Sequence, residues 1–182
     1  MKKILIIIFL LFSVSKLYSQ NNFIWDIVVD SLPETQNELY SKTKLFIGEM
    51  WISAQDVIQT DEKEAGIVLI KGTTEISRAW MTFTSNRRTW IFKYTIKFFV
   101  KDSKCRIILE DLRCTDAWDN NNVKQTLMPV STRYPEQNGK KITGVNEDQY
   151  YELMRSLRTD LQRIVDSYTE YMRKSDITND KW

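Results

Sequence analysis

The amino-acid sequence predicts one α+β domain, in which a strand and a helix are followed by a meander of four strands and a second helix. Three observations carry this prediction. Apolar and polar residues alternate along residues 89–100, which is typical of a strand with one buried face. Residues 35–54 and 146–174 instead repeat apolar residues every three or four positions, as amphipathic helices do. A chain of 182 residues, 42% of them hydrophobic, is long enough for one core and short for two.

The first 19 residues have the three-part layout of a secretory signal peptide. Two lysines are followed by nine apolar residues and then by a smaller, more polar stretch. The apolar run is too short for a membrane-spanning helix, which needs about 20 residues. We therefore expect export to the periplasm or the extracellular space, with cleavage after Ser19 and a mature N-terminus at Gln20. A buried N-terminal strand is the other interpretation of this segment.

Removal of this leader changes the net charge. The full chain has 26 Lys and Arg residues and 24 Asp and Glu residues. The leader holds three of the lysines and no acid, which leaves 23 basic and 24 acidic residues and a net charge of −1. A nucleic-acid-binding protein usually has a clear basic excess on one face. We therefore expect no nucleic-acid partner, and no membrane span once the leader is removed.

The first strand and the first helix of the mature chain have clear signals. Phe23–Val29 is predicted as a strand because most of its residues are β-branched or aromatic. Thr35 and Glu38 have the spacing of a capping box, which indicates that a helix begins there. The apolar stripe of this helix consists of Leu39, Thr43, Phe46, Ile47 and Met50.

Four strands are expected next. They are residues 56–61, Ile67–Ile76, Thr89–Val100 and Cys105–Cys114. Gly72 interrupts the second of them and predicts a bulge or a bend. The last two strands form a hairpin, whose inner face is expected to hold Trp90, Phe92, Tyr94, Ile96, Phe98, Val100, Cys105, Ile107 and Leu109.

The two cysteines are not expected to form a disulfide with each other. Cys105 and Cys114 are nine residues apart on one strand, a separation of about 30 Å, whereas a disulfide needs Cα atoms within about 7 Å. They also point to opposite faces, unless a bulge near Glu110 and Asp111 reverses the alternation. We expect both to be buried, reduced thiols, with intermolecular pairing as the alternative.

The last predicted element is a long helix over residues 146–174, with Asn146 as its N-cap. A long irregular connection, residues 126–145, precedes it, and a flexible polar tail, residues 175–182, follows it, so the single domain spans residues 20–174. The apolar residues of the helix step alternately by four and three, a heptad rhythm that suits either a helix lying on a sheet or a homodimeric coiled coil. The candidates for such self-association are Met154, Leu157, Leu161 and Ile164.

Several segments of this sequence resemble a known family. They are Asp56–Gly66 with the strand that follows it, the pair Lys71-Gly72, and Tyr94–Lys97 leading through Lys101-Asp102 to Arg106. These segments resemble a family of secreted bacterial domains of unknown function with a TATA-binding-protein-like (TBP-like) fold. The resemblance covers residues 23–115 and implies a curved antiparallel sheet of about five strands with both helices on one face. It implies no catalytic residues.

Two positions depart from the pattern of this family. Ser103 stands where the family tends to have glycine in the turn after Lys-Asp, and Ile107 stands where it favours an aromatic residue. The fold name carries no implication of DNA binding, because function belongs to sites and not to folds.

The composition excludes most catalytic chemistry. The chain has no histidine, which removes Ser-His and Cys-His nucleophile systems and every histidine-containing zinc site. No glycine-rich phosphate loop is present. We therefore predict no catalytic residue, no metal ligand and no cofactor, and expect the protein not to be an enzyme. The acidic groupings Glu110-Asp111 and Asp116/Asp119 are the first candidates for a carboxylate-dependent hydrolase. Asp116, Asp119 and the asparagines of residues 120–122 form either a calcium site or a simple polar loop.

The face of the sheet opposite the helices is the candidate binding surface. With both helices on the Trp90 face, alternation leaves polar and apolar residues together on the other face: Ile67, Leu69, Lys71, Ile91, Lys93, Lys97, Phe99, Arg106 and Ile108. A monomer rarely leaves such an apolar patch bare. Three interpretations of this patch remain open. Residues 126–145, or a loop carrying Trp80 and Phe83, fold over the patch and cover it. Otherwise an unknown protein or small-molecule ligand binds there, or the register of one strand differs from the one assumed.

Three functions are compatible with these features. The first is an exported, non-catalytic binding or interaction module that acts through this open face. The second is a structural envelope protein that self-associates through the last helix. The third is a hydrolase that uses carboxylates.

Overall fold

The structure is a computed structural model that describes residues 23–78, 88–116, 128–130, 136–137, 140–141 and 146–174. The predicted signal peptide, the Trp80/Phe83 loop, most of the 126–145 connection and the C-terminal tail lie outside these residues. No helix within the described ranges is long and apolar enough to cross a membrane.

The expected order of elements is confirmed, with one added helical turn. The strands of the main sheet have the order β1-β5-β4-β3-β2, and all pairs are antiparallel. A short strand, β6, extends the sheet along β5, and β7 and β8 form a separate pair. The elements are β1 Trp25–Val29, α2 Gln36–Met50, α3 Ala54–Val57, β2 Ile58–Glu62, β3 Ile67–Arg78, β4 Arg88–Lys101, β5 Lys104–Asp116, β6 Met128–Pro129, β7 Glu136–Gln137, β8 Lys140–Lys141 and α4 Glu147–Arg173.

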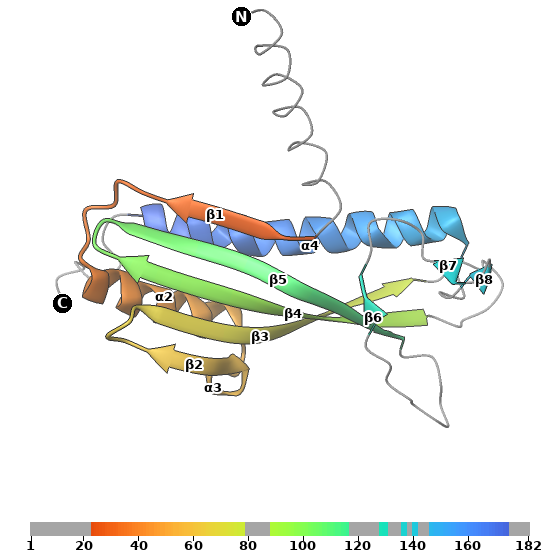
Figure 1. The fold of residues 1–182 in the computed structure, drawn as a ribbon, viewed down its shortest axis with the longest axis horizontal. Coiled ribbons are helices and arrows are strands. Elements are labelled where there is room, and N and C mark those ends of the chain that lie inside the picture. The colour runs from red at the N-terminus through yellow and green to blue at the C-terminus, as the bar shows by residue number, and fades with distance from the viewer. Residues whose placement is uncertain are drawn as a thin grey trace, which may run out of the picture.

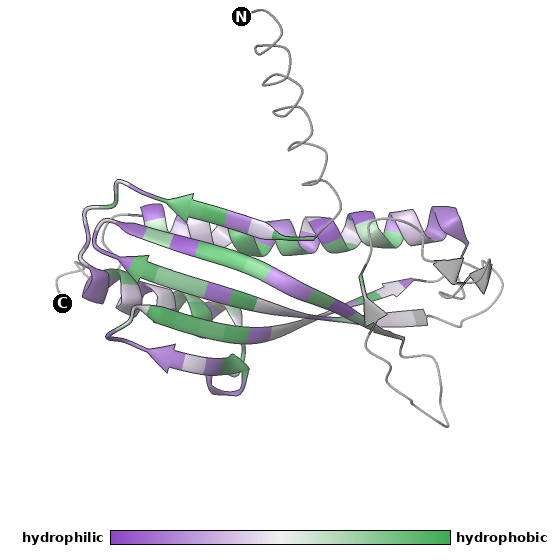
Figure 2. Cartoon of the chain, in the orientation of Figure 1, coloured by the Kyte–Doolittle hydropathy of each residue, from purple (hydrophilic) through white to green (hydrophobic). Residues whose placement is uncertain are grey.

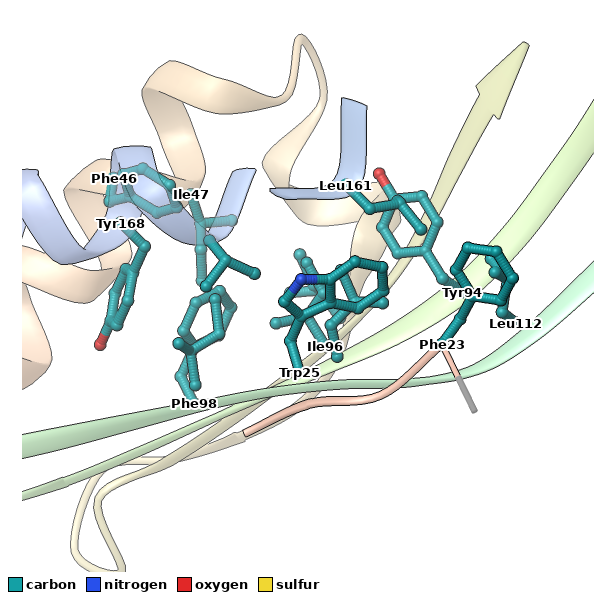
Figure 3. Close-up of a cluster of buried hydrophobic side chains, with 14 of the residues drawn as sticks. Phe23, Trp25, Phe46, Ile47, Tyr94, Ile96, Phe98, Leu112, Leu161 and Tyr168 are labelled. Carbon is teal, nitrogen blue, oxygen red and sulfur yellow. The ribbon is translucent and has the colours of Figure 1, made fainter. Parts of the chain in front are cut away.

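Both long helices pack on one face of the twisted sheet, as Figure 1 shows. The inner face of the β4–β5 hairpin is therefore buried, and the nine residues predicted for it are each at most 4% exposed. The ring of Tyr168 from α4 lies 4.8 Å from the ring of Phe98 and 5.2 Å from that of Phe46, measured between centroids (Figure 3). Aromatic residues from β4, α2 and α4 thus meet in the centre of one core.

The Tyr168 hydroxyl is fully buried and lies 3.1 Å from the hydroxyl of Thr43. Thr43 donates its own proton to the carbonyl of Leu39, so Tyr168 donates to Thr43. Burial raises the pKa of Tyr168 well above its usual value and raises that of the neighbouring Cys105 thiol to about 11. Both groups therefore remain protonated at neutral pH, as expected of core-filling side chains.

The hairpin turn between β4 and β5 positions the start of α2. The carboxylate of Asp102 accepts from the backbone N–H of Gln36, and the N–H of Ser103 donates to the carbonyl of Glu34. Glu38 accepts from the N–H of Thr35, which confirms the predicted capping box. Ser103 adopts φ 64° here, so serine occupies the left-handed conformation for which glycine is usually favoured.

A buried lysine joins the two long helices. The ammonium of Lys42 in α2 lies 2.7 Å from the carboxylate of Glu34, and it also donates to the carbonyls of Met172 and Lys174 at the end of α4. All three ammonium protons therefore have acceptors, although Lys42 is only 7% exposed. Its positive charge also lies at the negative end of the α4 helix dipole.

One predicted strand boundary was wrong, and so was one of the two alternatives predicted at Gly72. The strand predicted over residues 56–61 begins at Ile58, because Ser53 and Asp56 hydrogen-bond to each other and close the helical turn α3 before it. Gly72 forms no bulge, since the β3–β4 register is unbroken from Ile67 to Arg78. A Cβ at Gly72 would instead lie 2.2 Å from the ring of Tyr94, so this glycine makes room for that ring.

A bulge occurs on β5, where the sequence allowed for one. The β4–β5 register shifts between Lys93 and Thr95, and Asp111 on β5 has φ 53°. The extra residue turns Leu112 into the core and places Cys114 on the same face as Cys105. Cys105 is buried and Cys114 is partly buried.

The apolar stripe of α4 belongs to the core of the same chain. Met154, Leu157 and Leu161 are at most 7% exposed, whereas Ile164 is only partly buried. After Leu161 the buried positions continue at Val165, Tyr168 and Met172. This spacing is close to the 3.6 residues of a straight helix rather than the 3.5 of a coiled coil. The contacts with the sheet therefore account for the stripe without a second copy of the chain.

Substitution of Gly72 is expected to disturb the core. Gly72→Ala places a methyl group against the ring of Tyr94 and should lower the free energy of unfolding by about 1–3 kcal/mol. Gly48→Ala is the matched control, because no atom lies within 4 Å of a Cβ at this helical position, and it should raise stability by about 0.5–1 kcal/mol. Urea denaturation measures both, and equal effects of the two substitutions would contradict the packing described.

Removal of the Lys42 ammonium is expected to destabilise the domain strongly. Lys42→Met leaves the partly buried carboxylate of Glu34 without its counter-ion and should cost about 3 kcal/mol. Lys44→Met, on the same helix, breaks only the more exposed pair with Asp61 and should cost less than about 1 kcal/mol. Free energies of unfolding from urea titrations would test this difference, and a loss of similar size in both variants would rule it out.

Candidate binding surface on the open sheet face

The structure places all nine predicted surface residues on the face of the sheet opposite α2 and α4, which we call the open sheet face. Cross-strand pairing joins them in rows: Ile67 lies opposite Phe99, which lies opposite Arg106. Leu69 lies opposite Lys97, and Lys97 lies opposite Ile108. The remaining members, Lys71, Ile91 and Lys93, continue the face toward the far end of β4.

The end of this face near the β4–β5 hairpin is mainly apolar. Ile67, Leu69, Phe99 and Ile108 are each half-buried, and Figure 2 shows that the central strands are most hydrophobic toward this end. Val28 of β1 joins them opposite Arg106 and is 54% exposed. The sequence did not place Val28 on this face, because the pairing of β1 with β5 connects segments that are about 80 residues apart.

Two ion pairs cross the apolar end. Arg106 binds Asp26 through two hydrogen bonds of 2.7 and 2.6 Å, which lower the pKa of the Asp26 carboxyl and raise that of the guanidinium. Lys97 pairs with Glu110 on the neighbouring strand. The charges of Lys97 and Arg106 are therefore balanced within the sheet.

The other end of the face holds a shallow hollow of about 520 Å³ with unbalanced charge. Lys71, Lys93 and Arg113 line it, together with a single carboxylate, that of Asp111. Asp111 accepts from Nε of Arg113 at 2.9 Å. No ion-pair partner of Lys71 or Lys93 is found among the described residues, so the hollow carries two positive charges in excess.

Sequence reasoning missed Arg113 because its direction depends on the bulge. Without the extra residue at Asp111, strict alternation would turn Leu112 outward and Arg113 inward. The available signal is the adjacent Glu110-Asp111 pair, where the sequence allows a bulge.

The remaining candidate residues form no site with this face. Met154, Leu157 and Leu161 are in the core, and Ile164 lies beside them. Asp116 ends β5, and Asp119 lies outside the described residues. Within the described ranges, no three side chains of the metal-binding types Cys, Asp and Glu come together.

Residues 128–130 of the 126–145 connection lie at the edge of the sheet. Met128 and Pro129 pair with β5, and the N–H of Val130 donates to the carbonyl of Leu112. These three residues therefore extend the sheet sideways. Farther along the connection, β7 and β8 form their own two-stranded pair and do not join this sheet. The other residues of the connection and the Trp80/Phe83 loop, the two candidate covers of the open face, are outside the described residues.

A larger hollow of about 820 Å³ lies beside the first turns of α4. Its lining includes two acidic residues, Asp148 and Glu152, and two arginines, Arg155 and Arg158, so its charge is balanced. The smaller hollow on the sheet combines a charge excess with a neighbouring apolar surface. It is therefore the better candidate for specific binding.

Fold and surface together define a TBP-like α+β domain with helices on one side of the sheet and a mixed apolar and cationic surface on the other. Residues 25–115 match the family described as a domain of unknown function (DUF4468) with TBP-like fold, and the chain belongs to this family.

Two crystal structures have a similar fold. A DUF4468 family protein from Bacteroides ovatus superposes with a TM-score of 0.54 at 12% identity, over 81% of this chain and 86% of that one. A TBP-like protein from Parabacteroides distasonis gives a TM-score of 0.59 at 9% identity, over 85% of this chain and 95% of that one. At these identities the similarity shows the fold alone. No curated protein matches the sequence.

Proposed function

We propose that the protein is an exported, non-catalytic binding module that acts through the open sheet face. The observation that carries this proposal is the half-buried apolar cluster of Ile67, Leu69, Phe99 and Ile108 on a sheet face that bears neither long helix. Contiguous apolar surface of this kind marks interaction sites in soluble proteins.

The arrangement of charges favours a partner that is partly apolar. Lys97 and Arg106 are already paired with acids, so they offer polar edges around the apolar cluster rather than free charges. A protein surface or a small molecule with an apolar body fits such an environment. The balanced charge of this end gives no support to nucleic-acid binding, whatever the fold name suggests.

A binding role also suits the chemistry of the face. It carries hydroxyl, ammonium, guanidinium and carboxylate groups, but no histidine exists in the chain to act with a nucleophile. Arg106 lowers the pKa of the Asp26 carboxyl, which favours the ionised carboxylate over a general acid. Glu110 and Asp111 are each engaged with a cation as well. No observation favours the hydrolase, and the burial of Leu157 and Leu161 removes support from self-association through α4.

Site-specific photo-crosslinking in the cells that make the protein tests this proposal. A photoreactive phenylalanine analogue at Leu69 should give a discrete crosslinked product, because this side chain lies on the open sheet face. The same analogue at Leu45, which is 46% exposed on α2, is the matched control and should give none. Phe99→Ala should remove the Leu69 product while the protein stays folded. The absence of any product from Leu69 at native abundance, or the same product from both positions, would contradict the proposal.

Export is proposed on the basis of the first 19 residues, and the mature protein provides its test. N-terminal sequencing of the protein from fractionated cells should give Gln20 in the periplasmic or extracellular fraction. A substitution that places acids in the leader, Lys2→Glu with Lys3→Glu, should leave the uncleaved chain in the cytoplasm. An intact N-terminus in the cytoplasm of unmodified cells would show that the leader is not cleaved.

A further inference from the structure

We propose that the hollow around Lys71, Lys93 and Arg113 binds a doubly charged oxyanion, as a free phosphate or sulfate ion or as the ester group of a larger molecule. This inference deepens the proposed function, since the hollow lies on the open sheet face, and it names the chemistry of one part of the ligand. It rests on the register of the strands and on the charges of the lining.

The three cations are neighbours on one face of the sheet. Lys93 lies directly opposite Arg113 across the β4–β5 pair. Lys71 pairs with Thr95, two residues from Lys93, so Lys71 and Lys93 are diagonal neighbours. Diagonal positions in a sheet are about 7–8 Å apart, within reach of long side chains that converge on one ligand.

Like charges directly opposite each other destabilise a sheet. The domain nevertheless holds Lys93 and Arg113 in this arrangement, and it does so through a bulge. The bulge places Asp111, a residue with a side chain, at φ 53°, a conformation that is uncommon outside glycine. Bulges of this kind commonly redirect side chains next to functional sites. Here the redirected side chain is Arg113.

Asp111 also orients the guanidinium that it brings to the face. Its carboxylate accepts from Nε of Arg113, and the described residues supply no acceptor for the two Nη nitrogens. A guanidinium held in this way presents its planar edge to an oxyanion, the geometry that favours phosphate, sulfate and carboxylate groups. The two lysines add point charges from the other strands.

The charge and the size of the hollow decide between ligands. Three cations and one carboxylate leave an excess of two positive charges, which a dianion neutralises. Phosphate monoesters carry a charge of about −1.5 to −2 at pH 7. A hollow of about 520 Å³ is within the range of small-molecule sites, so it accommodates the anion together with part of the molecule that bears it.

Titration of the purified mature chain with inorganic phosphate, with inorganic sulfate and with glucose 6-phosphate tests the proposal. In low-salt buffer, backbone amide NMR signals of Gly72 and Thr95 should shift in a saturable manner with the dianions. Tighter binding of glucose 6-phosphate than of phosphate would identify an ester-bearing molecule as the ligand, and equal binding would identify the free ion. Absence of saturable shifts with all three probes would overturn the proposal.

Substitutions in the lining should act in opposite directions. Lys93→Gln removes one cation and should weaken phosphate binding about fivefold. Asp111→Asn tolerates the same backbone conformation and keeps a side-chain oxygen that accepts from Nε of Arg113, but it removes the competing negative charge, so it should strengthen binding about threefold. Lys63→Gln, in the exposed turn between β2 and β3, is the matched control for a lost positive charge and should change nothing. Equal weakening in the Lys63 and Lys93 variants would indicate a general charge effect and would overturn the site.

A thermal measurement separates this role from a structural one. Without ligand, Lys93→Gln should raise Tm by about 1–3 °C, because it relieves repulsion with Arg113. A lower Tm would show that Lys93 stabilises the fold and would remove the argument from like charges. Crosslinking at Leu69 tests the apolar end of the open sheet face and does not depend on phosphate. The oxyanion site can therefore fail in the titration while the proposed function holds, and the reverse is also possible.

Discussion

The rest of the structure depends on the alternation of buried and outward side chains along β4, the central strand. From Trp90 to Val100 every second side chain is buried against the core beneath α2 and α4. Since successive residues of a strand point to opposite faces, the same run sends Ile91, Lys93, Lys97 and Phe99 to the other side. The burial of one set therefore dictates the composition of the open sheet face.

The bulge at Asp111 connects this core to the candidate ligand site. It lets β5 satisfy the core with Leu109 before the extra residue and with Leu112 after it. The same shift turns Arg113 toward Lys93. The bulge thus completes the apolar core on the inner face, through Leu112, and forms the cationic hollow on the open sheet face, through Arg113.

Sequence patterns were sufficient wherever the controlling contacts are local. The alternation in β4 predicted its buried face, and the Thr35–Glu38 spacing predicted the start of α2. Long-range contacts were beyond this reasoning. Lys42 donates to the carbonyl of Met172, 130 residues later in the chain, and β1 pairs with β5 rather than with its neighbour in sequence. The heptad pattern predicted where α4 is apolar but not how far it departs from a coiled coil, because the sheet sets which side is buried. The candidate surface was predictable by alternation, except for Arg113 and Val28.

The two faces of the sheet also differ in what folding requires of them. The buried side chains of the inner face belong to one apolar core, and within it the hydroxyl of Tyr168 from α4 is satisfied by Thr43. Folding requires no such arrangement of Lys93 and Arg113, since a threonine or glutamine at either position would keep the strand and remove the repulsion. Lys93 has no ion-pair partner among the described residues, and Arg113 uses only its Nε in the pair with Asp111. An arrangement that costs stability in this way is explained by a contact with another molecule. The lining of the cationic hollow is therefore the part of this surface that indicates the chemistry of the ligand most directly.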